Sequence, residues 1–149
     1  MTPPSVGAAG GADVAAILAV LDGAYWPFAA RFRPTALREN ADSVAAELAT
    51  WLVAREADQV TGCVKHYPDG DWYTLCFLAT RAESRRRGHA GALLDEVAVR
   101  ARSAGHRTVR IALRRSLTGN VDFFVRHGYR YLEPFPTGEH DLYQLSMGA

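Results

Sequence analysis

The stretch Arg85-Arg86-Arg87-Gly88-His89-Ala90-Gly91 combines cations with small residues where a predicted strand, 72–80, leads into a predicted helix, 90–103. The first turn of a helix offers N–H groups without an intrahelical acceptor and the positive end of the helix dipole. Small residues let such a backbone approach a ligand closely, and arginine side chains suit phosphate oxygens. The motif therefore indicates a phosphate or pyrophosphate site, with a solvated basic turn as the plainer alternative.

Length and composition are those of an ordinary globular protein. A chain of 149 residues can bury a core and is most simply one domain, 1–149, with residues 1–4 expected to be disordered. Hydrophobic residues make up 48% of the chain and charged residues 22%. The formal net charge is +1, whereas a nucleic-acid-binding domain needs a larger basic excess. We therefore expect no nucleic-acid partner.

The residue content also bears on compartment and ligands. Cys63 and Cys76 lack the spacing of a metal site, so we predict no metal and two reduced thiols, with a cross-strand disulfide as the alternative. No segment resembles a secretion signal or is long enough to cross a membrane, so we expect a cytoplasmic protein with no membrane partner. Lys65 is the only lysine among 17 basic residues, which with the alanine content suggests a GC-rich bacterial genome.

Apolar periodicity and turn residues predict elements in the order β-α-α-β-β-β-α-β-α-β-β. The predicted strands cover 5–8, 51–55, 60–67, 72–80, 107–113, 129–133 and 141–147. The first predicted helix starts after Asp13, which serves as its N-cap. The other predicted helices cover 35–49, 90–103 and 120–127. An antiparallel run followed by a strand–helix–strand crossover predicts a mixed α+β sheet with helices on its faces.

Several of these segments, taken in order, resemble the GCN5-related N-acetyltransferases (GNAT), which move an acetyl group from acetyl-CoA to an amine. The resemblance runs from about Val6 to Met147. It rests on the strand 60–64 with its glycine, the strand end Leu78-Ala79-Thr80, the R-x-x-G-x-A loop from Arg85 to Ala90, and a last helix that ends in Gly128-Tyr129. Each feature alone is common, and their shared order makes the match specific.

The resemblance implies a GNAT-type, mostly antiparallel sheet with a central β-α-β crossover, and acetyl-CoA as co-substrate. By similarity, the backbone of Leu78, Ala79 and Thr80 would bond the pantetheine and acetyl group. The pyrophosphate would be held by the loop residues Arg85, Arg86, Arg87, Gly88, His89, Ala90 and Gly91, with the His89 side chain staying at the surface. Asn120 and Phe124, on the last helix, would contact the cofactor arm.

The residues at the usual catalytic positions depart from the family pattern. The tyrosine that often protonates the departing thiolate corresponds to Phe124, and the usual glutamate positions correspond to Thr74 and Ala112. A phenyl ring cannot donate a proton. We therefore predict catalysis mainly by proximity and orientation, with Thr74 holding a water chain that takes the amine proton. The alternative is a non-catalytic acyl-CoA-binding module.

The acceptor is predicted to be a small molecule with a primary amine. Tyr25, Trp26, Phe28 and Phe32 cluster where the family covers its acceptor, either as an aromatic wall or as core. His140 is a possible base in a loop that borders the acceptor in relatives. Family members often form dimers, so a homodimer is possible here.

Overall fold

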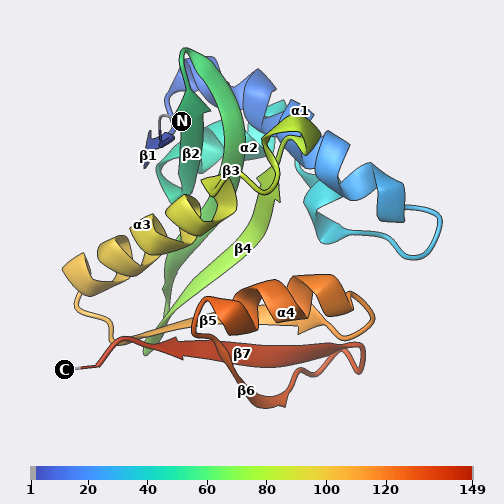
Figure 1. Cartoon of the computed structure of the whole chain (residues 1–149), viewed down its shortest axis with the longest axis vertical. Coiled ribbons are helices and arrows are strands. Elements are labelled where there is room, and N and C mark those ends of the chain that lie inside the picture. Colours follow the sequence, from blue (N-terminus) through green and yellow to red (C-terminus); the bar gives the residue numbers. More distant parts are fainter. Residues whose placement is uncertain (1–2, 149) are drawn as a thin grey trace. The chain divides into compact units, whose positions relative to one another are not determined.

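The computed structural model describes residues 3–148. Figure 1 shows its strands and helices, coloured along the chain. The strands are β1 (Ser5–Ala8), β2 (Trp51–Glu56), β3 (Gln59–Asp69), β4 (Trp72–Thr80), β5 (Thr108–Arg114), β6 (Arg130–Pro134) and β7 (His140–Ser146). The α-helices are α1 (Val14–Tyr25), α2 (Ala41–Ala46), α3 (His89–Ser103) and α4 (Thr118–Arg126). Residues 1–4 are predicted to be disordered, and two of them, Met1 and Thr2, lie outside the described residues.

The strands form one seven-stranded sheet in the order β1-β2-β3-β4-β5-β7-β6. The pairs β1–β2, β2–β3, β5–β7 and β6–β7 are antiparallel, whereas β4 and β5 run parallel, with Tyr73 opposite Val109 and Thr74 opposite Arg110. Because α3 connects these two parallel strands, it forms the predicted β-α-β crossover. The mixed α+β fold class is thereby confirmed.

The chain divides into two compact units, each built from two stretches of sequence. Unit 1 is the chain up to His66 together with Phe77–Glu96. Unit 2 is Tyr67–Cys76 together with the chain from Val97 onward. Strand β4 and helix α3 each contribute residues to both units.

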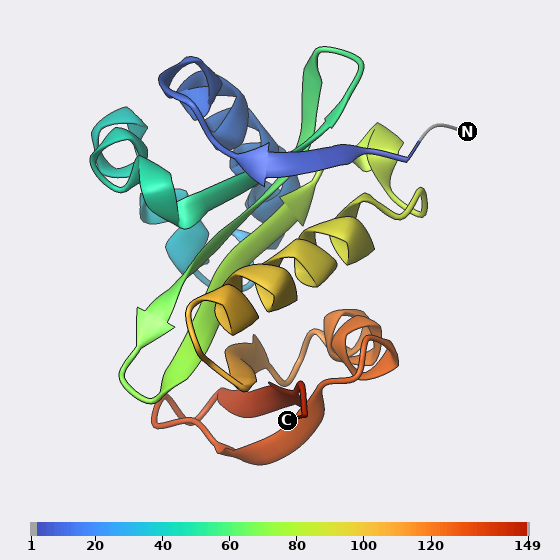
Figure 2. The ribbon, with the colours of Figure 1, turned by 90° about the vertical axis from the view of Figure 1, so that its left-hand side faces the viewer.

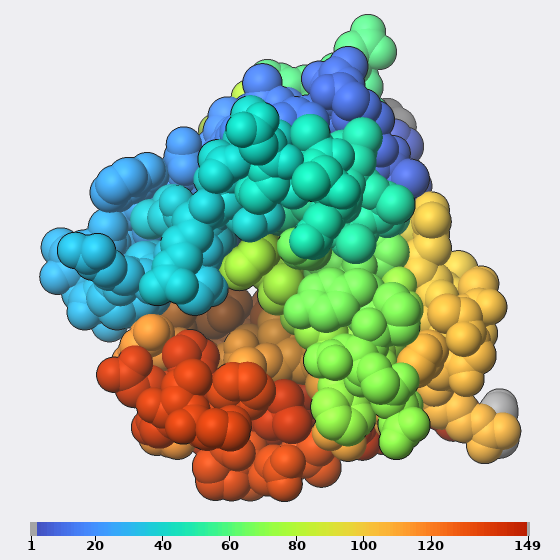
Figure 3. All heavy atoms as spheres, turned by 180° about the vertical axis from the view of Figure 1, so that it is seen from behind, coloured from blue at the N-terminus to red at the C-terminus, as the bar shows by residue number. Residues whose placement is uncertain are grey.

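In unit 1 helices cover both faces of the strands. The inward face of α1, with Ile17 and Leu21, packs with Val44 of α2 against Trp51 and Cys63. The neighbouring Gly62 faces the other way, toward Leu93 of α3, since successive residues of a strand point to opposite faces. Figure 2 shows α1 and the first turns of α3 on opposite sides of these strands. In Figure 3, α1, the turns after it and α2, in blue to cyan, form a continuous surface.

In unit 2 the alternation of β5 is regular. Val109, Ile111 and Leu113 are buried, while the residues between them are partly exposed. This matches the predicted alternation of apolar residues. Phe124 of α4 packs edge-on against Tyr129, with ring centroids 5.2 Å apart, and both side chains are buried.

The predicted second helix, 35–49, is wrong. The segment contains a 3-10 turn at Thr35–Arg38, a break at Glu39, and the short helix α2. Asn40 starts α2 afresh, because its side chain accepts from the Ser43 amide while Ser43 Oγ accepts from the Asn40 amide, both at 2.9 Å. This reciprocal pair is a capping box, which fixes a helix start at Asn40.

Asp13 is the N-cap residue of α1, as predicted, but its side chain makes no capping hydrogen bond to this helix. Its carboxylate instead accepts from the Gly10 amide at 2.8 Å and from the Arg55 guanidinium at 2.6 Å. The hydrogen bond from Arg55 lowers the pKa of Asp13. Asp13 therefore ties the start of α1 to β2.

Candidate functional site

The loop between β4 and α3 has a backbone shaped for an anion. Arg86 and Gly88 have positive φ angles of 64° and 85°. Arg85 has a φ of −66°, and Arg87 is not among the positive-φ residues. Arg85 is extended, whereas from Arg86 to Gly88 the sign of φ alternates within a turn, and successive N–H groups in such a turn form an anion-binding concavity. The sequence of this loop predicted a close backbone approach, and the structure supplies the curvature for it.

The concavity leads directly into the start of α3. The carbonyl of Gly88 accepts from the Ala92 amide at 3.0 Å, so the helical hydrogen bonds begin at this glycine. The amides of His89, Ala90 and Gly91 occupy the first turn, where a helix has no acceptors of its own for them. The loop therefore offers a run of N–H donors together with the positive end of a 15-residue helix.

The three consecutive arginines divide into two kinds. The side chains of Arg85 and Arg86 are exposed, and within residues 3–148 no carboxylate pairs with them. Arg87 instead donates to Oε1 of Glu56 at the end of β2, with Nη2 and Oε1 2.5 Å apart. Arg85 and Arg86 can therefore meet a phosphate, while the charge of Arg87 is largely compensated inside the protein.

His89 is not at the surface, contrary to the prediction. Its side chain is buried, with 2% of the residue exposed. Nδ1 lies 2.6 Å from Thr61 Oγ1, and Nε2 lies 3.1 Å from Glu56 Oε2. The ring thus anchors the first turn of α3 to β2 and β3, and only the backbone of His89 remains available to a ligand.

Gly62 explains how α3 comes so close to the strands. A Cβ atom at this position would lie 3.0 Å from the Ala79 carbonyl oxygen and 3.1 Å from Cδ1 of Leu93 and Cγ2 of Thr80. Any larger residue would push apart β3, the end of β4 and the start of α3. The glycine noted in the sequence therefore sets the position of the loop.

Near its end, strand β4 departs from regular extended geometry. Phe77 has a φ of 56°, which is unusual for a bulky residue and interrupts the pleat. The next residue, Leu78, accepts a hydrogen bond of 3.0 Å on its carbonyl from the hydroxyl of Tyr25 in α1. Ala79 is buried and Thr80 is partly exposed. Tyr25 thus positions a backbone group that the sequence assigned to the cofactor.

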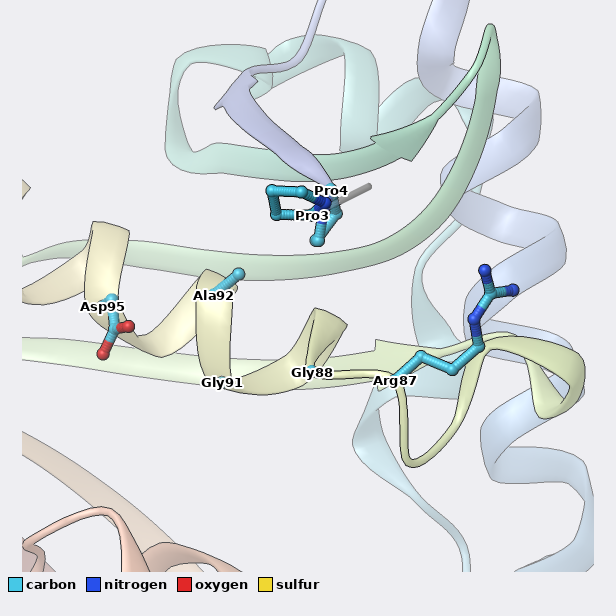
Figure 4. Close-up of a pocket in the computed structure, with 7 residues that line it drawn as sticks. All are labelled: Pro3, Pro4, Arg87, Gly88, Gly91, Ala92 and Asp95. Atoms are coloured by element: carbon cyan, nitrogen blue, oxygen red, sulfur yellow. The ribbon is translucent and has the colours of Figure 1, made fainter. Parts of the chain in front are cut away.

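An open pocket of about 450 Å³ lies beside the first turns of α3. Figure 4 shows Pro3 and Pro4 on one side and Gly88, Gly91 and Ala92 on the other, with Asp95 a turn further along. The Asp95 carboxylate makes the helix face unfavourable for an anion. Phosphate groups are therefore better placed at the loop amides than deep in this pocket.

In unit 2 the structure places Thr74 on β4 opposite Arg110 of β5. Ala112 is two residues further along β5 on the same face, opposite Leu142 of β7. Neither Thr74 nor Ala112 carries an ionisable group, so neither can act as a general base at neutral pH. Thr74 and Ala112, which stand where the family usually has a glutamate, therefore lie on the same face of the sheet as Arg110.

The two predicted residues of α4 differ in accessibility. Asn120 is exposed in the first turn of the helix. Phe124 is 1% exposed and contacts the rings of Phe123 and Tyr129. Burial raises the pKa of the neighbouring Tyr129, and its hydroxyl has no hydrogen-bond partner within the described part of the chain. Packing accounts for Phe124, whereas Asn120 is open to a ligand.

The remaining candidate residues with reactive side chains are His140 and the two cysteines. Burial, aided by the charge of Arg114, lowers the pKa of His140, whose Nδ1 lies 2.7 Å from Thr137 Oγ1. Cys63 and Cys76 are reduced thiols rather than a disulfide. Within residues 3–148 no group of His, Cys, Asp or Glu could hold a metal ion, and no helix is long and apolar enough to span a membrane.

Sequence reasoning found the loop but missed three structural details. It assigned no role to Glu56, to the hydrogen bond from Tyr25, or to Arg110, whose guanidinium lies over the Trp72 ring. A signal for Arg110 was present, because it alternates with buried Val109 and Ile111 and must face away from them.

Comparison with known proteins establishes the family. The family described as acetyltransferase (GNAT) matches residues 17–129, so the chain belongs to the GNAT acetyltransferases. No curated protein sequence gives a significant match.

Solved structures share the fold at low sequence identity. The PaiA N-acetyltransferase of Thermoplasma acidophilum, solved with coenzyme A, has a TM-score of 0.85 at 13% identity, covering 98% of this chain and 99% of that one. The ribosomal-protein-S18-alanine N-acetyltransferase of Escherichia coli has a TM-score of 0.75 at 16% identity, covering 98% and 95%. The N-acetylglutamate synthase of Neisseria gonorrhoeae, complexed with coenzyme A and N-acetyl-glutamate, has a TM-score of 0.80 at 13% identity, covering 100% of this chain and 36% of that one.

Proposed function

We propose that the protein transfers the acetyl group of acetyl-CoA to the amine of a small molecule. The observation that carries this proposal is the turn from Arg86 to Gly88, with its alternating φ sign, at the start of α3, in a chain of the GNAT family. Converging amides and exposed guanidinium groups are the donor set that a pyrophosphate requires. A related fold solved with coenzyme A supports the same ligand.

The donor is assigned to the following groups. Backbone amides from Arg86 to Gly91 hold the pyrophosphate, and the side chains of Arg85 and Arg86 add charge. The backbone of Leu78, Ala79 and Thr80 bonds the pantetheine and acetyl group, and the exposed Asn120 bonds the pantetheine arm. Arg87 and His89 serve the site indirectly, by fixing the loop to Glu56 and Thr61.

The chemistry needs little from side chains. Acetyl-CoA supplies an activated thioester, whose carbonyl carbon takes the lone pair of a neutral amine while the thiolate leaves. Holding the two reactants in line provides most of the rate. The hydroxyl of Thr74 holds a water that accepts the surplus amine proton, and the thiolate leaves without a tyrosine donor, since Phe124 has no proton to give.

A panel of amines tests the proposal. Purified protein with acetyl-CoA is expected to release free thiol with at least one amine, and mass spectrometry is expected to find the matching acetylated product. Thr80→Pro, which deletes a backbone donor, is expected to weaken acetyl-CoA binding in calorimetry. Unchanged affinity in that variant would remove β4 from the site.

A non-catalytic acyl-CoA-binding module is the second candidate. It is favoured by one observation, the complete burial of Phe124 at the position where relatives carry a tyrosine. Binding of acetyl-CoA without thiol release from any amine in the panel would establish this candidate in place of the first.

A further inference from the structure

The outward face of β4, β5 and β7 in unit 2 carries a cation held in a fixed orientation. The guanidinium carbon of Arg110 lies 4.1 Å from the centroid of the Trp72 ring. Arg110 Nε donates to Gln144 Oε1 at 2.8 Å. A position over the indole ring together with a hydrogen bond at Nε restricts the rotation of the guanidinium group.

The four residues concerned share one face of the sheet. Arg110 is opposite Thr74 on β4 and opposite Gln144 on β7. Trp72 precedes Thr74 by two residues and so points to the same side. Arg110 is therefore next to the threonine at which the proposed amine proton leaves.

The charge of Arg110 is not compensated by the protein. Its partners are a neutral amide and a neutral ring, and within residues 3–148 no carboxylate pairs with it. Arg114, on the same face, differs in pairing with Glu139 at 2.9 Å. Ala112 places only a methyl group between the two arginines. A partly buried, oriented guanidinium without a counterion is suited to an anionic ligand.

We infer that the acceptor amine also carries a carboxylate, and that Arg110 binds this carboxylate through its terminal nitrogens. With the guanidinium carbon over Trp72 and Nε donating to Gln144, the Nη edge remains and carries two parallel N–H donors. That edge matches the two oxygens of a carboxylate in plane. This inference rests on the proposed function and narrows its acceptor class to amino-acid-like molecules.

Matched acceptors test the inference. Amino acids are compared with their own carboxamides, which keep the amine and the side chain but lose the negative charge. The wild-type protein is expected to prefer the carboxylate in kcat/KM. Arg110→Gln is expected to reduce that preference by roughly 10- to 100-fold, through KM of the acceptor with little change in KM of acetyl-CoA. Comparing the preference between variants cancels the difference in amine pKa between acid and amide.

Two further variants keep the test decisive. Arg110→Lys preserves the charge but not the parallel donors, so it is expected to restore part of the preference. Arg126→Gln removes an exposed arginine of α4 and the same net charge, and it is expected to leave the preference unchanged. Thermal unfolding of all variants checks that each is folded.

The outcomes separate this inference from the proposed function. Equal or better use of carboxamides by the wild-type protein overturns the inference while leaving acetyl transfer intact. An unchanged preference in Arg110→Gln does the same. If no amino acid, no carboxamide and no other amine without a carboxylate leads to thiol release, the proposed function itself is overturned.

Discussion

Nδ1 of His89, the first residue of α3, lies 2.6 Å from the hydroxyl oxygen of Thr61 on β3. The other ring nitrogen lies 3.1 Å from Glu56, which also receives Arg87. The loop that carries the anion-binding backbone is thus fixed by a polar cluster, defined as Glu56, Thr61, Arg87 and His89, in which Thr61 and His89 are buried and the other two are partly exposed. The cluster converts a flexible basic turn into a fixed one.

His89→Ala is expected to lower the free energy of unfolding by about 2 kcal/mol, because it removes a buried ring and the contact of that ring with the Thr61 hydroxyl. Urea unfolding followed by circular dichroism measures this. His127→Ala, which truncates the exposed histidine directly after α4, is the control and is expected to cost much less. Equal losses in the two variants would argue against an anchoring role for His89.

Gly62→Ala is expected to destabilise the protein by about 1–3 kcal/mol, since the new Cβ would meet backbone and side-chain atoms at 3.0–3.1 Å. Gly23→Ala is the control, and it is expected to change the free energy of unfolding in the opposite direction. Gly23 lies in α1 with nothing within 4 Å of an added Cβ, so alanine there is expected to stabilise by about 0.5–1 kcal/mol. Thermal unfolding of the pair checks both directions, and tolerance of alanine at Gly62 would refute the close approach.

Arg85→Gln is expected to weaken coenzyme A binding roughly fivefold and to make the affinity less sensitive to salt, because an exposed guanidinium near a phosphate acts through a screened charge. Arg87→Gln is expected to change the affinity less, since Glu56 already compensates that charge. Calorimetric titration at two salt concentrations distinguishes them. A larger effect from Arg87 than from Arg85 would reverse the assignment of the two arginines.

The stability contribution of Asp13 is expected to depend on pH. Its pKa is lowered below the ordinary 3.8 by the hydrogen bond from Arg55, so the ionised form is favoured in the folded protein. A lowered folded-state pKa contributes stability above pH 3.8 that is lost as the pH falls through the folded-state value. Wild type is therefore expected to exceed Asp13→Asn by about 1 kcal/mol at pH 7, with the difference shrinking below pH 3.8. Asp22→Asn, at an exposed position of α1, is the control for the loss of one negative charge from this part of the chain.

The strands and long helices could be predicted from the sequence to within a few residues. Alternation of apolar residues, as at Val109, Ile111 and Leu113, and turn glycines such as Gly70 and Gly105 state the local geometry directly. The break at Glu39 was missed because a capping box of Asn40 and Ser43 overrides a weak helical periodicity.

Parts of the candidate site could not be predicted for a different reason. The positive φ of Phe77 and Arg86 is not signalled by residue type, because such backbone conformations are imposed by surrounding structure. The burial of His89 and the stack of Arg110 on Trp72 depend on partners 28 to 38 positions away in the chain. Sequence periodicity places each residue on a face but does not state which side chain it meets there.

The left-handed backbone of Arg86 also affects the stability of the folded protein. A left-handed conformation costs a residue with a Cβ atom about 1 kcal/mol, and glycine would adopt it without that cost. Replacing Arg86 with glycine would therefore favour the folded state while removing an exposed cation from the anion site. Stability and ligand affinity are set against each other at this one position, so a search for thermostable variants alone would select against the arginine.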